Sequence, residues 1–172
     1  MQLPENYYEL FGVEPALIPN KLAIRKQFFS LSKQYHPDKY AQEDAKTQDA
    51  ILALSAHINN AYKTLMDDML AMEYALLQQG IVHADEKYAL PSTFLMEMME
   101  SNEALEDAVA AGDTNKILEQ QLAIQAIKDV LDKQMQPMVA SNIAALKPED
   151  LQLAKEYYYK KKYLNRILAA EQ

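Results

Sequence analysis

Two side chains that could do chemistry stand together in the tripeptide His36-Pro37-Asp38. An imidazole and a carboxylate can serve as base and orienting group in hydrolysis when a nucleophile lies beside them. Here Pro37 separates the two, and the sequence places no Ser or Cys nucleophile nearby. A hydrolase or metal-dependent enzyme using His36 and Asp38 is one hypothesis. The tripeptide alone fits a simple turn better, because Pro and Asp are common turn residues.

Other reactive groups are scarce. The chain contains no Cys, which excludes disulfides, zinc knuckles and cysteine nucleophiles. The three histidines, His36, His57 and His83, lack the spacing of metal ligands. We therefore expect no metal, no cofactor and no catalytic residue, and a function that depends on binding.

The composition indicates an all-α protein. Ala, Leu, Lys, Gln and Glu dominate the 172 residues, only 3 residues are Gly, and 49% are hydrophobic. These residue types favour helices and suffice for a packed core. No run reaches the roughly 18 apolar residues of a membrane span, and the first residues, MQLPENYY, do not look like a signal peptide. We expect a cytoplasmic protein without a membrane partner.

Charge is distributed unevenly along the chain. The net charge of -8 makes nucleic acid an unfavourable partner. Yet one short stretch holds five basic residues, opposed only by Asp38: Lys21, Arg25, Lys26, Lys33 and Lys39. A basic patch on an acidic protein predicts docking to a specific acidic partner surface.

Helical periodicity organises the first half. A short apolar segment over residues 7–11 ends at Gly12, and two longer helices are predicted over residues of about 20–35 and about 42–66. Their apolar stripes are Ile24, Phe28, Leu31 and Tyr35, and then Ile51, Leu54, Ile58, Ala61, Tyr62 and Leu65. Pro37 must end the first of these helices, so the His36 loop is expected at the tip of an antiparallel hairpin. A shorter helix should cover residues 70–79.

The second half predicts a separate helical bundle. The segment GIVHADEKYALP, residues 80–91, lacks periodicity, so we expect domains over residues 1–80 and 91–172. Three helices, over residues of about 92–110, about 114–144 and about 148–170, should form an antiparallel bundle. Pro137 is expected to kink the middle helix. The expected core faces are Phe94, Met98, Leu105 and Val109, then Ile117, Gln121, Ile124, Leu131 and Met135, and finally Leu153, Tyr157, Leu164 and Leu168.

Some apolar side chains of this bundle fall outside the expected core. At about 100° per residue, Leu95 lies at the edge of the first helix's core face, and Met96 and Met99 lie well off it. On the last helix, Tyr159 and Tyr163 also point away from the core face. Exposed Met, Leu and Tyr can form a binding surface. Packing against the first domain, or a wide core, explains them equally well.

The first half resembles the J-domain of DnaJ-class co-chaperones. YYELFGV stands where the first J-domain helix is found, and QYHPDKY lies between a basic helix and a long apolar-striped helix. The resemblance covers residues of about 5–66. It implies that His36, Pro37 and Asp38 dock on a DnaK-class ATPase chaperone and stimulate its ATPase. Arg25, Lys26, Lys33 and Lys39 would supply the electrostatic part of docking, which mainly raises the association rate.

The second half resembles the C-terminal domain of the HscB family, through the segment PSTFLMEMMESNEALED. HscB-family proteins are J-type co-chaperones of iron–sulfur cluster assembly. The resemblance implies an HscA-type chaperone and an IscU-type scaffold protein as partners. Carried onto this sequence, the scaffold-binding residues would be Leu95, Met96, Met99, Glu100, Glu103 and Tyr163. The alternative is a J-domain co-chaperone of a general DnaK-type chaperone with a different client.

Overall fold

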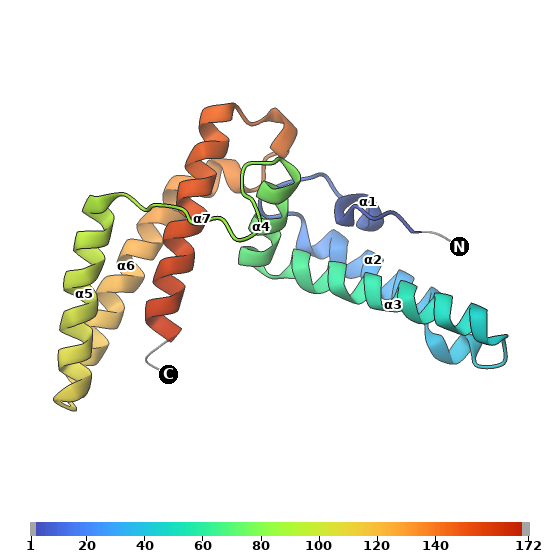
Figure 1. Ribbon diagram of the computed structural model, residues 1–172, viewed down its shortest axis with the longest axis horizontal. Helices are drawn as coiled ribbons and strands as arrows, with labels where there is room; N and C mark the ends of the chain where they lie inside the picture. Colours follow the sequence, from blue (N-terminus) through green and yellow to red (C-terminus); the bar gives the residue numbers. More distant parts are fainter. Residues whose placement is uncertain (1–2, 170–172) are drawn as a thin grey trace. The chain divides into compact units, whose positions relative to one another are not determined.

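The computed structural model describes residues 3–169, and its regular elements there are all helical (Figure 1). This confirms the expected all-α class. The chain divides into two compact units. In chain order the elements are α1 (Tyr7–Phe11), α2 (Lys21–Gln34), η1 (Pro37–Tyr40), α3 (Ala45–Met66), α4 (Asp68–Gln78), α5 (Ser92–Ala110), α6 (Thr114–Val139), η2 (Ile143–Ala145) and α7 (Pro148–Ala169).

The N-terminal unit is built on the predicted hairpin, in which α2 and α3 lie side by side (Figure 1). Asn20 and Asp44 begin these helices by accepting hydrogen bonds from backbone N–H groups of the first turn, which would otherwise lack partners. The predicted stripes face each other: Ile24, Leu31, Ile51, Ile58 and Leu65 are buried. Phe28 stacks on Tyr62 with ring centroids 3.9 Å apart. The short helices α1 and α4 complete this unit.

A segment distant in sequence belongs to the same unit. Residues 139–146, which connect α6 to α7, cluster with residues 1–79. The Ile143 N–H donates to the Pro15 carbonyl (2.8 Å), and the Ile18 N–H donates to the Val139 carbonyl (2.8 Å). Ile143 itself is buried. The sequence predicted one helix over about 114–144, but α6 ends at Val139 because the chain turns here to make these contacts.

The C-terminal unit consists of α5, of α6 as far as Met138, and of α7. Its core contains Phe94, Met98, Leu105, Ile124, Leu164 and Ile167, with Ile117, Leu131, Tyr163 and Leu168 packed around it. Two predicted core residues are wrong: Val109 is 45% exposed and Leu153 is 53% exposed. Ala108 and Ala154 are buried in their place. In both helices the buried face thus lies one residue away from the predicted position.

Pro137 lies inside α6, but the helix continues to Val139. Pro137 has no N–H to donate to the carbonyl of Lys133, one turn earlier in the helix, and α6 ends two residues after it. No helix within residues 3–169 is long and apolar enough to cross a membrane.

Candidate functional site

The loop at the tip of the α2–α3 hairpin is an ordered turn of 3₁₀ helix. His36 occupies its N-cap, and Pro37 follows at the first helical position, where its missing N–H costs nothing. The Lys39 N–H donates to the His36 carbonyl (3.0 Å). The Tyr40 hydroxyl reaches back to the Gln34 carbonyl at the end of α2 (3.3 Å). The loop is thereby fixed to both flanking segments.

The His36 ring is oriented by the loop backbone. Its Nδ1 accepts a hydrogen bond from the Asp38 N–H at 3.3 Å, so the neutral ring carries its proton on Nε2. The Asp38 carboxylate lies 3.6 Å from the same Nδ1, and the His36 and Asp38 side chains are 55% and 90% exposed. Such exposure suits contact with another macromolecule, which would meet an Nε2–H donor and a carboxylate acceptor side by side.

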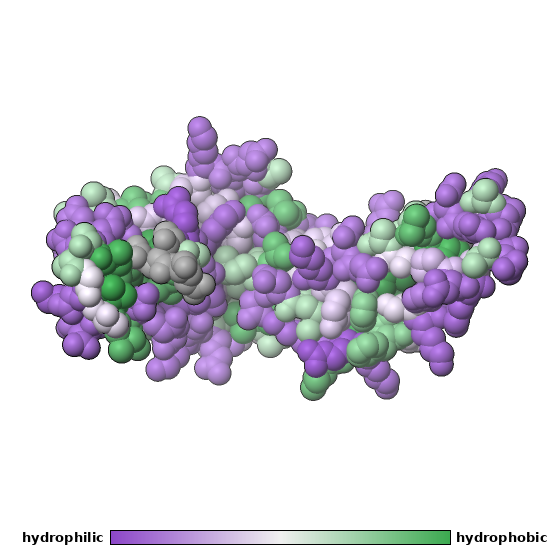
Figure 2. Space-filling view, turned by 90° about the horizontal axis from the view of Figure 1, so that it is seen from below, coloured by the Kyte–Doolittle hydropathy of each residue, from purple (hydrophilic) through white to green (hydrophobic). Residues whose placement is uncertain are grey.

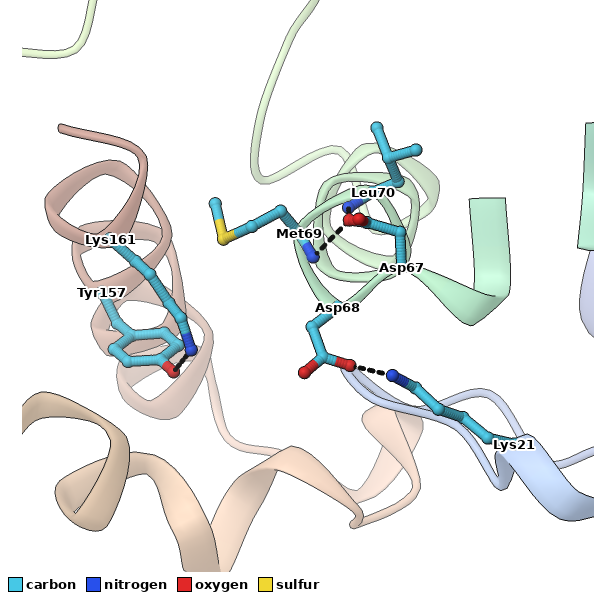
Figure 3. A network of polar contacts seen from close by, with 7 residues as sticks. All are labelled: Lys21, Asp67, Asp68, Met69, Leu70, Tyr157 and Lys161. Atoms are coloured by element: carbon cyan, nitrogen blue, oxygen red, sulfur yellow. Dashed lines mark hydrogen bonds and ion pairs between the residues drawn. The ribbon is translucent and has the colours of Figure 1, made fainter. Parts of the chain in front are cut away.

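Four of the five basic residues between positions 21 and 39 keep their charges available. Arg25, Lys26, Lys33 and Lys39 are exposed, and none forms an ion pair with a residue in the described range 3–169. Lys21 differs, because its ammonium group pairs with the Asp68 carboxylate at the start of α4 (Figure 3). Lys21 was predicted to belong to the basic patch, but its charge is neutralised by the Asp68 carboxylate.

The structure shows a mixed apolar and basic row that sequence reasoning missed on α2. Leu22 and Phe29 are 79% and 64% exposed. Together with Lys26 and Lys33 they follow the i, i+4, i+7, i+11 spacing of one helix face. This spacing is present in the sequence, but the apolar stripe predicted for this helix, from Ile24 to Tyr35, lies on another face. Among the described residues, no cluster of three or more potential metal ligands is present.

The second candidate site is the outer face of α5. Met96 and Met99 are 65% and 57% exposed, Glu100 and Glu103 are exposed, and Leu95 is half-buried. These five residues lie where the helical angles placed them, away from Phe94 and Met98. Apolar side chains interrupt a largely polar surface on the face of the molecule drawn in Figure 2.

Tyr163, the sixth predicted residue, has a different environment. Its ring meets the Phe94 ring edge-on, with centroids 6.0 Å apart, and it packs against the bundle core. The sequence placed Tyr163 outside the core face, so this placement is a correction. Three further exposed apolar residues, Leu118, Leu122 and Val130, lie on α6 and were not identified from the sequence.

Comparisons with known proteins agree with both halves of the fold. Residues 6–74 match the family model of the DnaJ domain. Residues 90–170 match the model described as the HSCB C-terminal oligomerisation domain. The two matched ranges do not overlap, and residues 75–89 lie between them.

Curated relatives cover most of the chain. A protein of Colwellia psychrerythraea named "Co-chaperone protein HscB homolog" is 32% identical over 142 residues, which are 81% of each chain. A protein of the same name from Vibrio vulnificus is 33% identical over 83% of this chain and 89% of the relative.

Two solved structures share the fold. Chaperone HscB from Vibrio cholerae superposes with a TM-score of 0.70 at 26% identity, and covers 96% of this chain and 97% of its own. Human co-chaperone protein HscB gives a TM-score of 0.82 at 23% identity, over 99% and 84% of the two chains. The chain belongs to the HscB family of J-domain co-chaperones, which act with an Hsp70-type chaperone in iron–sulfur cluster assembly.

Proposed function

We propose that this protein delivers an IscU-type iron–sulfur scaffold protein to an HscA-type chaperone in the cytoplasm and stimulates the ATPase of that chaperone. The observation that carries the proposal is that one chain bears two separate exposed sites. One is the ordered His36–Asp38 loop with its available cations, and the other is the Met96–Met99 face of α5. The protein itself would catalyse no reaction and would bind no nucleotide, metal or cluster.

The two sites suit different tasks. Exposed cations on α2 attract an acidic chaperone surface and mainly raise the association rate. The flexible, polarisable Met96 and Met99 can adapt to an apolar patch on the scaffold, while Glu100 and Glu103 would select a partner with basic groups nearby. Because both sites are on one chain, the chaperone and its client are held at a raised effective concentration.

The scaffold site is tested by calorimetry with purified apo scaffold protein at two salt concentrations. We expect saturable binding by the wild-type protein, and at least about tenfold weaker binding by a Leu95→Ala/Met99→Ala variant, because apolar anchors dominate interface energies. Tyr163→Ala is a poorer first choice because Tyr163 supports Phe94.

A Leu118→Ala/Leu122→Ala variant is the matched control, since it removes two exposed leucines from α6 instead. Equal affinities for wild-type and the α5 variant would refute the site. Absence of any scaffold complex, with ATPase stimulation intact, would leave a J-protein that serves another client or a general DnaK-type chaperone.

The chaperone site is tested with His36→Gln. This change removes the imidazole ring and its Nε2–H donor, while the loop remains exposed. ATPase stimulation should therefore be lost, and scaffold binding should persist. Stimulation that survives in the variant would show that this loop does not trigger the chaperone.

A further inference from the structure

A groove in the C-terminal unit lies largely outside the scaffold site proposed above. Its volume is about 740 Å³, and it lies between α7 and the segment 86–90, which has no regular secondary structure. Its walls carry three tyrosines, Tyr88, Tyr159 and Tyr163, and three cations, Lys87, Lys162 and Arg166. Of these residues only Tyr163 belongs to the predicted scaffold site.

The aromatic side chains of this wall pack against neighbouring groups. Tyr88 stacks on Tyr159 with centroids 4.6 Å apart and planes 8° apart. The Lys155 ammonium lies 5.6 Å from the centre of the Tyr88 ring. Tyr163 is supported edge-on by Phe94. A tyrosine offers a large apolar contact area and loses little conformational entropy on binding, because its side chain has only two χ angles. This wall can therefore bind apolar side chains.

The charge of the groove is opposite to that of the chain. Glu86, the carboxylate at its edge, is paired with Lys155 at 2.5 Å. Lys87 and Arg166 are exposed and form no ion pair with any residue that the structure describes. The Arg166 guanidinium lies 5.0 Å from the Tyr163 ring centre. On a protein of net charge -8, such a local positive site favours an acidic ligand.

The remaining wall is an unpaired backbone. Residues 87–90 have no regular structure, and within residues 3–169 their N–H and C=O groups make no hydrogen bonds. Extended backbone groups that lack partners can pair with an added strand, in which the main chain supplies affinity and alternate side chains supply specificity. The free edge adjoins the tyrosines and the cations, since Lys87, Tyr88 and Leu90 themselves line the groove.

We propose that this groove binds an extended acidic segment of a partner protein. The segment pairs its backbone with residues 87–90, places carboxylates on Lys87 and Arg166, and rests alternate apolar side chains on Tyr88 and Tyr159. This is a third interaction surface, distinct from the His36–Asp38 loop and from the Met96–Met99 face.

The test uses a fluorescently labelled, N-acetylated heptapeptide of alternating Glu and Leu, titrated with the full-length protein and followed by anisotropy. Saturable binding is expected. A Lys87→Glu/Arg166→Glu variant should bind at least about tenfold more weakly, since charge-assisted contacts are lost and repulsion replaces them. The control variant, Lys46→Glu/Lys133→Glu, has the same net charge but is altered outside the groove and should bind like wild-type.

The backbone component is tested with two further peptides, methylated on alternate amide nitrogens. Strand pairing uses only the amides on one edge of a strand, so one methylated peptide should lose binding and the other should retain it. A peptide of alternating Lys and Leu should not bind, and Leu95→Ala/Met99→Ala should leave peptide affinity unchanged.

The proposal is overturned if the Glu/Leu peptide shows no saturable binding to wild-type protein. It is equally overturned if the control variant loses as much affinity as the groove variant, or if both methylated peptides behave alike. Because scaffold binding is measured separately with the α5 variant, failure of the groove leaves the proposed function unaffected.

Discussion

At the scale of single residues, a polar network between α6 and α7 stands out within the helical bundle. Lys161, only 9% exposed, donates to Asp132 Oδ1 (2.8 Å) and to the Tyr157 hydroxyl (2.9 Å). The Tyr157 hydroxyl in turn donates to Asp132 Oδ1 (2.6 Å); Figure 3 shows the Lys161–Tyr157 contact along one face of α7. Every charge is hydrogen-bonded, which is the condition for tolerating an ion pair away from water.

Removing Lys161 should therefore destabilise the protein. Lys161→Met leaves Asp132 without its cation. We expect a loss of about 1–3 kcal/mol in the free energy of unfolding, less than for a wholly buried pair, because the Asp132 side chain is 41% exposed. Urea unfolding measures the change. Lys133→Met, at an exposed site on α6, should have little effect; equal losses in both variants would contradict a specific role for the network.

The same network predicts a pH dependence of stability. Burial works to raise the pKa of Asp132, but hydrogen bonds from Lys161 and Tyr157 outweigh it and hold the pKa below its usual value. The stabilisation is thus present above the unfolded-state pKa of about 3.9 and is lost as the pH falls through the lower folded-state pKa. The stability difference between wild-type and Asp132→Asn should shrink on acidification from pH 7.

At alkaline pH the other two groups act together. Burial, followed by the hydrogen bond to Asp132, raises the pKa of Tyr157 to about 12. Burial would lower the pKa of Lys161, but its hydrogen bonds to Asp132 and Tyr157 raise it. Both contributions are complete below a pH of about 10, where the unfolded groups begin to titrate, and disappear as the pH rises through the folded-state values. The acidic prediction for Asp132 has its own contrary outcome. A difference in the free energy of unfolding between wild-type and Asp132→Asn that stays constant from pH 7 to strongly acidic pH would contradict the stabilising role of the Asp132 carboxylate.

At the scale of elements, capping residues set where the helices of the N-terminal unit begin. Asp67 separates α3 from α4, and its carboxylate accepts hydrogen bonds from the N–H groups of Met69 and Leu70, each at 2.9 Å (Figure 3). The next residue, Asp68, pairs with Lys21 of α2. One short junction thus starts α4 and connects it to the hairpin.

Asp67→Ala should cost about 1 kcal/mol in stability, the usual effect of losing an N-cap. Asp67→Asn is the matched variant, since its amide oxygen can still accept both hydrogen bonds and stability should be nearly preserved. Thermal unfolding of the two variants beside wild-type provides the measurement. If alanine and asparagine destabilise equally, the charge of Asp67 matters rather than its cap.

The sequence predicted the elements better than their edges. Helix type, order and the buried faces of α2 and α3 follow from a local period of 3.6 residues, which each segment carries by itself. Val109 and Leu153 were predicted in the core but are exposed, because the helical period gives the direction of a buried face and not its width. The neighbouring residues Ala108 and Ala154 are buried instead. The end of α6 depends on Ile143 meeting Pro15, a contact between distant residues that no local pattern encodes. The His36–Asp38 loop could be predicted as a candidate site because its three residues are adjacent in the sequence, whereas the groove beside Tyr88 combines residues from two distant segments.

At the scale of the whole molecule, the chain carries exposed surfaces of different chemistry. Helix α2 and the loop that follows it carry exposed cations, and the Met96–Met99 face of α5 is apolar with acidic neighbours. The chain as a whole has a net charge of -8 and therefore repels acidic partners, except where exposed cations such as Lys26 and Lys33 attract them. Electrostatic docking of this kind weakens as salt screens the charges.

Association with the chaperone should accordingly depend on salt through α2. Lys26→Ala/Lys33→Ala should lower the association rate and flatten its dependence on ionic strength, with a smaller effect on dissociation. Stopped-flow mixing at several salt concentrations measures both rates. Lys46→Ala/Lys63→Ala, at exposed positions on α3, is the control, and an identical salt slope in both variants would count against docking through α2.

The return of residues 139–146 to the N-terminal unit has a consequence for biosynthesis. When the ribosome has made residues 1–79, the backbone partners of Pro15 and Ile18 do not yet exist. The J-domain can form its hairpin early, but it acquires its last buried side chain, Ile143, only after α5 and α6 have been translated. Completion of the first unit therefore waits on the second, and a nascent chain would expose the Pro15–Ile18 surface to chaperones for most of its synthesis.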